Sequence, residues 1–309
     1  GSGHRSTIAA AILWSYGYTD AGSLKGGFGG WAGEGYPVMG GAPDLDAGYS
    51  TFLADMEGYN TISLDALNTA LVESPPFILD VRNASELEDG GYIDGAVLIP
   101  LNDLFTSTEY LPSFDTPIVS YCGSGWRCTI ALTYLEAMGW EDVKGLKGGS
   151  FGGWMDAGYA YTEGVPAEAE ILNAVTVSDT TEVFFDDAVE NISEIGGWGG
   201  ISADDLNLAL IDNPDFTLID VRRSEELEAK GVIESGDWTH IALEDFVANK
   251  ADWPADKDAP IVVYCGSGHR STIAMAILYS YGYTDVKSLK GGFGGWAEAG
   301  YPVAEFVAP

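Results

Sequence analysis

The chain has few basic residues, few cysteines and no long apolar runs. Lysine and arginine number 14 against 47 aspartates and glutamates, which gives a formal net charge of −33 at pH 7. A surface of that sign repels nucleic acids and anionic lipids, so both are excluded as partners. No apolar run approaches the roughly 20 residues that cross a bilayer, so we expect no membrane span. The acidity favours an extracytoplasmic protein, periplasmic or secreted, over one in the cytoplasm of a salt-adapted organism.

Three cysteines in 309 residues cannot form a disulfide framework, so each cysteine needs its own explanation. No group of histidines, cysteines and carboxylates has the spacing of metal ligands. No glycine motif for a phosphate or a dinucleotide stands in its proper strand and helix context. We therefore expect neither a metal nor a cofactor. Apolar residues make up 46% of the chain, which is enough for folded domains.

The sequence repeats itself. Residues 1–38 and 266–303 differ at six of 38 positions, and 123–159 is a looser third copy. A matching front half precedes only the second and third copies along the chain, so a complete unit is present twice. The predicted regions are the back half of a domain at 1–39, a linker and leading helix at 40–57, a complete domain at 58–165, a second linker and leading helix at 166–197, and a second complete domain at 198–309.

The N-terminal half-unit begins just after the position that a cysteine occupies in the two complete units. Without that cysteine and the front strands we do not expect it to be catalytic. A half-domain leaves sheet edges open, and open edges pair with other chains. This predicts self-association through residues 1–39.

Each complete unit alternates short apolar strands with helices. The strands read FILDV, AVLIP, PIVSYC and DVKGL in the first unit, and TLIDV, THIAL, PIVVYC and DVKSL in the second. A helix after the third strand ends at Gly139 or Gly282, where glycine commonly terminates helices. Alternation of this kind predicts an α/β fold with a parallel sheet covered by helices on both faces.

The third strand of each unit runs into Cys-Gly-Ser-Gly-x-Arg and then a helix, where open α/β sheets bind ligands. The small residues let successive backbone N–H groups face one point, and the helix dipole and the arginine add positive potential. A cysteine there ionises readily and becomes a nucleophile. The candidate nucleophiles are Cys122 and Cys265. The candidate substrate-binding residues are Gly123, Ser124, Gly125, Trp126, Arg127, Gly266, Ser267, Gly268, His269 and Arg270.

These loops resemble the active-site loop of the rhodanese family. The stretch DVRNASELEDGGYIDGAVLIP at 80–100 resembles that family's second signature, and LKGGSFGGWMDAGY and LKGGFGGWAEAGYPV resemble its C-terminal pattern. The resemblance implies tandem domains, each with a parallel five-stranded sheet and helices on both faces. It also implies a thiosulfate sulfurtransferase, which moves sulfane sulfur from thiosulfate or a similar small anionic donor to cyanide or a thiol.

Carried onto this chain, the resemblance implies that Cys122 and Cys265 take up sulfur as a persulfide and release sulfite. Arg127 and Arg270 would offset the charge of the donor, and the N–H groups of the two loops would cradle the terminal sulfur. The second unit departs from the pattern, because it has two more residues before Ile241. Both cysteines are kept as candidates, since this change does not touch the loop.

Two other functions stay open. One is a non-catalytic repeat protein that serves assembly or carries a persulfide. The other is an oxyanion enzyme that acts on phosphate or arsenate. The loop counts six residues from cysteine to arginine, whereas related phosphatases and arsenate reductases use one residue more. The shorter loop favours a single sulfur atom over a tetrahedral oxyanion.

Several neighbours of the loops have two interpretations. Trp126 and His269 occupy the same position, which favours a rim residue that shapes access over an acid or base. Cys128 stands where the second unit has Ser271, which favours a small packed side chain over a resolving thiol.

Aspartates at the end of the first strand of each unit precede an arginine by two residues. We interpret these pairs, Asp80 with Arg82 and Asp220 with Arg222, as electrostatic braces. Arg82 and Arg222 are also candidates for the mouth of the pocket. The tryptophan of each GGW turn is expected to pack in the core; these are Trp31, Trp154 and Trp296.

Overall fold

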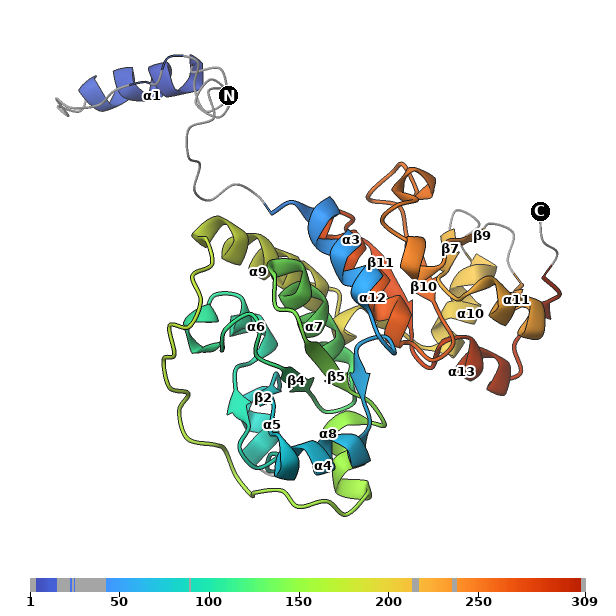
Figure 1. Cartoon of the computed structure of the whole chain (residues 1–309). Coiled ribbons are helices and arrows are strands. Elements are labelled where there is room, and N and C mark those ends of the chain that lie inside the picture. The colour runs from blue at the N-terminus through green and yellow to red at the C-terminus, as the bar shows by residue number, and fades with distance from the viewer. Residues whose placement is uncertain are drawn as a thin grey trace. The chain divides into compact units, whose positions relative to one another are not determined.

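The computed structural model of the chain describes residues 4–15, 23, 25, 43–88, 90–212, 217–234 and 238–306 (Figure 1). Residues 1–41 and 42–309 form two separate units. In the first unit, α1 spans His4–Ser15. Most of the predicted half-domain, with Trp31, lies outside the described residues, so self-association through it stays a prediction. The helices that the structure describes include none that is long and apolar enough to cross a bilayer.

Two parallel sheets of the same topology form the complete domains. The first has the order β1-β5-β4-β2-β3 and the second β6-β11-β10-β7-β9. These confirm the predicted α/β fold with five-stranded parallel sheets. The strands of the first sheet are β1 (Thr61–Ile62), β2 (Phe77–Asp80), β3 (Val97–Leu98), β4 (Ile118–Tyr121) and β5 (Val143–Leu146). Those of the second are β6 (Gly200–Ile201), β7 (Thr217–Asp220), β9 (Trp238–His240), β10 (Ile261–Tyr264) and β11 (Val286–Leu289).

The central strands β4 and β10 are buried along their whole length, which explains their uninterrupted apolar sequence. The edge strands β1 and β6 have two residues each, too few to show a period, and were not predicted. A separate antiparallel pair joins β8 (Val232–Ile233) to β12 (Val303–Ala304), also without a sequence signal.

Helices cover both sheets. Ser63 accepts a hydrogen bond from the backbone of Ala66 and so caps α4, as its position before the helix predicts. The first domain has α4 (Leu64–Glu73), α5 (Ala84–Glu88), α6 (Leu101–Leu104), η1 (Thr108–Tyr110), α7 (Trp126–Met138) and α8 (Ser150–Asp156). The second has η2 (Gly197–Gly199), α10 (Ala203–Asp212), α11 (Ser224–Lys230), η3 (Leu243–Asp245), η4 (Lys250–Asp252), α12 (His269–Ser280) and α13 (Gly292–Glu298).

One apolar core joins the two complete domains. Helices α7 and α12, which follow the two cysteine loops, pack against each other. The hydroxyl of Tyr134 in α7 donates to the carbonyl of Ala276 in α12 over 2.9 Å. Buried residues of both sheets belong to the same cluster. The two nucleophile loops therefore start from one common interior.

The two leading helices bridge the domains. α3 (Leu45–Asp55) precedes the first domain, and its Asp46 bonds Lys250 and Tyr281 of the second. α9 (Asp179–Glu194) precedes the second domain and packs on α6 and α7 of the first. In α9, the Phe185 ring lies 5.1 Å from the Tyr134 ring. Each linker thus fastens its own domain to the other.

Candidate active site

Cys122 follows β4 directly, and its Sγ lies inside the loop that leads into α7. The backbone N–H of Gly125 donates to this sulfur over 3.1 Å. Gly125 is the N-cap of α7 and has a φ of 105°, a left-handed conformation that glycine adopts without strain. This turn directs the N–H groups of the loop toward the sulfur.

The Cys122 thiol is strongly activated. Burial would raise its pKa, but hydrogen bonds from the Cys128 side chain and from the backbone of Cys128 and Ser124, with the charge of Arg127, outweigh burial and lower the pKa to about 5. Cys122 is therefore a thiolate at neutral pH. A thiolate is the form of cysteine that attacks sulfur.

The second domain repeats this geometry. Cys265 follows β10, and the backbone N–H of Gly268 donates to its Sγ over 3.1 Å. Gly268 has a φ of 107° and caps α12. The glycine-rich turn after β11 supports the loop from behind, because the N–H of Phe293 donates to the carbonyl of Cys265. In the first domain the N–H of Phe151 does the same for Cys122.

Each loop arginine is paired with a glutamate. Arg127 makes two bonds of 2.6 Å to Glu86 in α5. Arg270 makes bonds of 2.6 and 2.7 Å to Glu226 in α11. The Arg270 hydrogen bond is the main reason that the pKa of Glu226 falls to about 2. The resemblance implied that these arginines offset the charge of the donor; each is paired with a carboxylate in the structure, and that role stays a prediction.

The expectation that Arg82 and Arg222 lie at the pocket mouth is wrong. Their residues are 3% and 1% exposed. Arg82 bonds both oxygens of Asp80 and the carbonyl of Gly91, and its guanidinium lies 4.0 Å from the Phe151 ring centre. Arg222 makes the matching contacts. The arginine follows its aspartate by two residues, so its side chain folds back on the strand end as an electrostatic brace.

The residue before each arginine reaches into the other domain. The indole N–H of Trp126 donates to the carbonyl of Trp198 over 2.7 Å. His269 Nε2 donates to the carbonyl of Tyr59 over 2.8 Å. Tyr59 and Trp198 occupy the same place in their units, and both have a φ near 58°. Trp126 and His269 are therefore interdomain contacts as well as parts of the pocket walls.

His269 is partly buried, which bears on its chemistry. Burial is the main reason that its pKa lies below the usual value, and the charges of Arg270 and Lys147 lower it further. The ring is neutral at neutral pH. Its Nδ1 lies 3.0 Å from Thr129 Oγ1, so both nitrogens have partners within the protein. This arrangement holds the domains together and gives no support to a role as acid or base.

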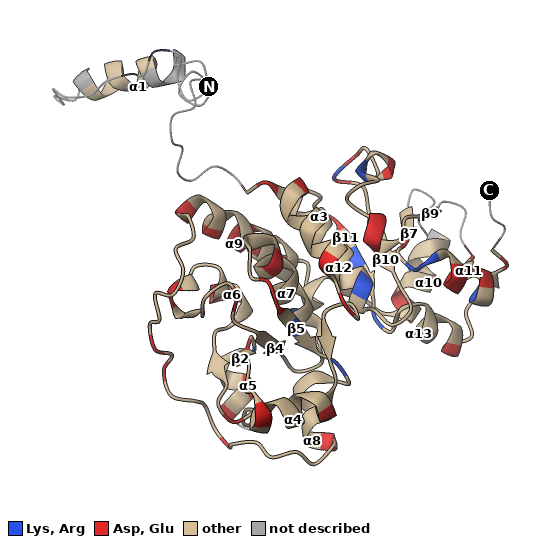
Figure 2. Cartoon of the chain, viewed as in Figure 1, with Lys and Arg blue, Asp and Glu red and all other residues tan. Residues whose placement is uncertain are grey.

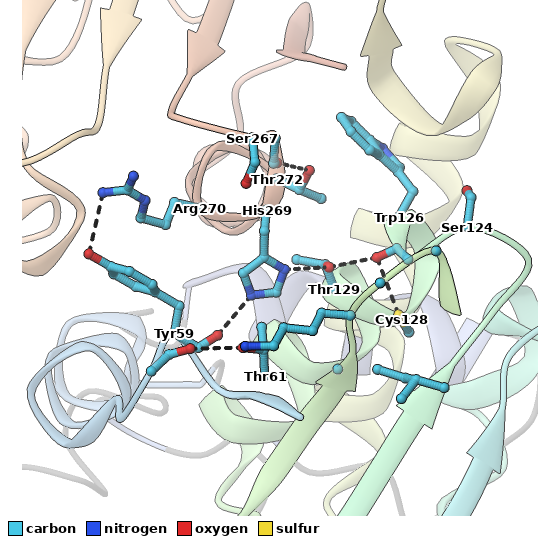
Figure 3. Close-up of a pocket in the computed structure, with 18 residues that line it drawn as sticks. Tyr59, Thr61, Ser124, Trp126, Cys128, Thr129, Ser267, His269, Arg270 and Thr272 are labelled. Carbon is cyan, nitrogen blue, oxygen red and sulfur yellow. Dashed lines mark hydrogen bonds between the residues drawn. The ribbon is translucent and has the colours of Figure 1, made fainter. Parts of the chain in front are cut away.

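A cavity of about 440 Å³ lies between the two loops (Figure 3). Ser124 and Trp126 of the first domain and Ser267, His269 and Arg270 of the second are on its wall. In Figure 3, the Tyr59 ring lies beneath Arg270, with a distance of 4.7 Å from guanidinium to ring centre. Further lining residues of the first domain are Thr61, Cys128, Thr129 and Lys147.

A second cavity, of about 600 Å³, lies at the same interface and shares Ser124, Trp126 and Ser267 with the first. Its wall holds Arg127 with Glu86, and Lys290 and Trp198 of the second domain. The two cavities correspond to each other, since Lys147 and Lys290 share the LKGG motif. Each loop arginine therefore shares its cavity with a lysine of the opposite domain. Figure 2 shows how few basic residues the complete domains carry among their acidic ones.

The sequence reasoning missed Glu86, Glu226, Lys147 and Lys290. Their signal is the repeat itself, because each pair occupies one position of the unit. Over the residues that the structure describes, no three histidines, cysteines or carboxylates are grouped to hold a metal ion.

A family model for the rhodanese-like domain matches residues 63–157 and 202–299. The chain belongs to the rhodanese-like domain family. Both matches contain a complete cysteine loop, so the two rhodanese-like domains each carry a candidate nucleophile. The finer domain boundaries at 58–165 and 198–309 stay a prediction.

Curated relatives include sulfurtransferases. A sulfurtransferase of Allochromatium vinosum is 36% identical over 109 residues, which cover 35% of this chain and 94% of that relative. Thiosulfate sulfurtransferase GlpE of Pseudomonas savastanoi pv. phaseolicola is 36% identical over 85 residues, 28% of this chain and 74% of that relative. A tRNA uridine(34) hydroxylase of Xanthomonas campestris pv. campestris is 31% identical over 110 residues, 31% of this chain and 43% of the hydroxylase. The relatives support a sulfurtransferase family without fixing the donor.

Solved structures show a looser likeness. A thiosulfate sulfurtransferase from Pseudomonas aeruginosa is 21% identical with a TM-score of 0.33, covering 79% of this chain and 43% of that chain. The 3-mercaptopyruvate sulfotransferase SseA of Escherichia coli is 18% identical with a TM-score of 0.35. The match covers 76% of this chain and 98% of SseA. Neither likeness bears on the reaction.

Proposed function

We propose that the protein is a thiosulfate sulfurtransferase with two working sites, in which Cys122 and Cys265 carry sulfane sulfur as a persulfide. The observation that carries this proposal is the backbone N–H held 3.1 Å from each cysteine sulfur. A ring of N–H donors stabilises an anionic sulfur before and after transfer. The same donors serve the thiolate and the persulfide, so the loop need not rearrange between them.

The reaction follows from the activated thiolate. Cys122 Sγ attacks the outer sulfur of thiosulfate, the sulfur–sulfur bond of the donor breaks, and sulfite leaves with the bonding electrons. An acceptor thiolate or cyanide then attacks the terminal sulfur of the persulfide and restores the Cys122 thiolate. Cys265 runs the same two steps. Because Arg127 and Arg270 are neutralised by glutamates, the lysines in the two cavities supply the positive charge that an anionic donor needs.

The test is sulfite release from thiosulfate by the full chain, with cyanide as acceptor. We expect Cys122→Ser and Cys265→Ser each to leave one working site, and the double variant to lose turnover altogether. Without an acceptor, each of Cys122 and Cys265 should release one sulfite from thiosulfate, and the intact mass of the Cys122→Ser variant should rise by one sulfur atom. A double variant that still releases sulfite at the original rate would overturn the proposal. A chain that gains sulfur but passes none to cyanide or a thiol would be a persulfide carrier instead.

A further inference from the structure

The two sites differ at the residue that touches the nucleophile from the first turn of the helix. In the first domain this residue is Cys128, which lies beside Gly125, the residue whose N–H donates to Cys122 Sγ over 3.1 Å. Cys128 Sγ lies 3.2 Å from the carbonyl of Gly125. In the second domain Ser271 takes the same place, with its hydroxyl 3.5 Å from Cys265 Sγ and 3.0 Å from the carbonyl of Gly268. One position thus holds a second sulfur in one site and an oxygen in the other.

Cys128 also connects Cys122 to the interdomain cavity. Cys122 and Cys128 are both buried, but of the two only Cys128 is on the wall of the cavity of about 440 Å³ (Figure 3). The Cys128 thiol therefore lies between the nucleophile and a space large enough for small molecules. A small molecule released beside Cys128 can leave through this cavity, and a thiol that attacks Cys128 can enter through it.

We propose that Cys128 resolves the persulfide of the first domain, an inference that rests on the proposed function. The terminal sulfur of the Cys122 persulfide takes the proton of the Cys128 thiol, and the Cys128 thiolate then attacks the inner sulfur. A disulfide between Cys122 and Cys128 forms, and the bond between Cys122 Sγ and the sulfane sulfur breaks. The sulfane sulfur leaves with the electron pair as hydrogen sulfide. The sulfane sulfur is reduced as the two cysteines are oxidised, so no other oxidant is needed.

The geometry suits this step. The Cys128 thiol occupies the place of the Ser271 hydroxyl, which lies 3.5 Å from Cys265 Sγ, and so stands next to Cys122 Sγ, the atom that it attacks. It is protonated while Cys122 is anionic, so it holds the proton that the leaving sulfide takes. The step changes what the two domains deliver. The first domain releases sulfide and stops until a thiol reductant opens its disulfide, whereas Ser271 leaves the persulfide of the second domain intact for an acceptor.

The experiment uses the full chain under anaerobic conditions with thiosulfate and no reductant. In the Cys265→Ser variant, where Cys122 is the remaining nucleophile, we expect one sulfide for each sulfite released. Its mass should show no added sulfur, and peptide mapping should find Cys122 linked to Cys128. In the Cys122→Ser variant we expect one sulfite, no sulfide and one added sulfur on Cys265.

Matched exchanges isolate the effect of Cys128. Cys128→Ser in the Cys265→Ser background should abolish sulfide release and leave a stable persulfide on Cys122. Ser271→Cys in the Cys122→Ser background should bring sulfide release to the second domain. A stable persulfide on Cys122 with Cys128 intact would overturn the inference and leave the proposed function standing. Absence of both sulfite and added sulfur in all variants would overturn both.

Discussion

The two rhodanese-like domains hold a cysteine at the same position of the same loop and differ in the side chains around it. Backbone donors are alike, since Gly125 and Gly268 lie at the same distance from their cysteine sulfur. The arginine–glutamate pairs are alike as well. The differences are in side chains: Cys128 against Ser271 beside the sulfur, and Trp126 against His269 at the interface. The two domains can therefore share the backbone contacts that stabilise an anionic sulfur and still differ in the reaction steps that depend on side chains.

Both cavities are lined by residues of the two domains together. The pocket around Arg270 is completed by Tyr59 and Lys147 of the first domain, and the pocket around Arg127 by Trp198 and Lys290 of the second. The common core explains this, because α7 and α12 pack side by side and bring both loops to one interface. Substitutions in one domain are thus expected to act on the other.

The largest expected effect tests whether the two domains fold together. Arg82→Met or Arg222→Met leaves Asp80 or Asp220 as an uncompensated carboxylate in the core. Breaking a buried pair in this way costs about 3–5 kcal/mol. Because one core joins the domains, we expect chemical denaturation to show a single unfolding transition. Each variant should lower the denaturant concentration at its midpoint.

Lys144→Met is the matched control, since its pair with Asp142 is exposed, with 37% and 42% of the side chains accessible. Exposed pairs contribute less than about 1 kcal/mol. Two separate transitions, of which Arg82→Met shifts only one, would show that the domains unfold independently in spite of their contacts.

A smaller effect tests the crossed lysines. Lys147→Gln should raise the KM for thiosulfate at Cys265 by about five- to tenfold, measured in the Cys122→Ser variant. The reason is that one contact between a lysine and an anionic donor contributes about 1 kcal/mol to binding. The same change should leave the KM at Cys122, measured in Cys265→Ser with a thiol reductant present, within about twofold. Lys290→Gln should show the reverse.

Either lysine acting mainly on the cysteine of its own domain would contradict this crossed arrangement. The kcat values separate the two roles of a lysine. A contact that binds the donor changes KM, whereas a loss of kcat with unchanged KM would point to a contact made in the transition state.

The fold was predictable where the sequence carries a local signal. FILD, IVSY and VKGL are short apolar runs between helices, so their parallel arrangement follows from alternation. The strands β1 and β6 are too short for a pattern, and the β8–β12 pair depends on a partner about 70 residues away. Elements of this kind are set by tertiary pairing, which a single segment does not encode.

The site was predictable in its backbone and not in its surroundings. Gly125 and Gly268 indicated the turn that points N–H groups at the sulfur, because few other residues adopt that φ. The contacts of Trp126 and His269 with the opposite domain depend on how the two domains pack. The position of Arg82 was predicted wrongly for a related reason. Its guanidinium could face an anionic ligand in the pocket or pair with a carboxylate of the protein, and in the structure it pairs with Asp80.

The smallest effect tests the interface position at which the domains differ. The pKa of His269 is lowered mainly by burial, so the folded ring stays neutral where an unfolded histidine takes up a proton. The unfolded state then binds more protons below about pH 6.5, and the free energy of unfolding falls as the pH drops. A ring that stays neutral throughout sets an upper limit of about 0.8 kcal/mol on this fall between pH 8 and pH 6.

His269→Trp should remove that pH dependence, because the indole N–H can donate to the Tyr59 carbonyl as Trp126 does to Trp198, and indole does not titrate. The measurement is the free energy of unfolding at pH 8 and pH 6 for both proteins. Other titrating groups, such as Glu136 with a pKa of about 7 through burial, cancel in the difference between them. An equal fall in both proteins would mean that His269 is protonated in the folded state, and the interface would then hold a charge that Trp126 lacks.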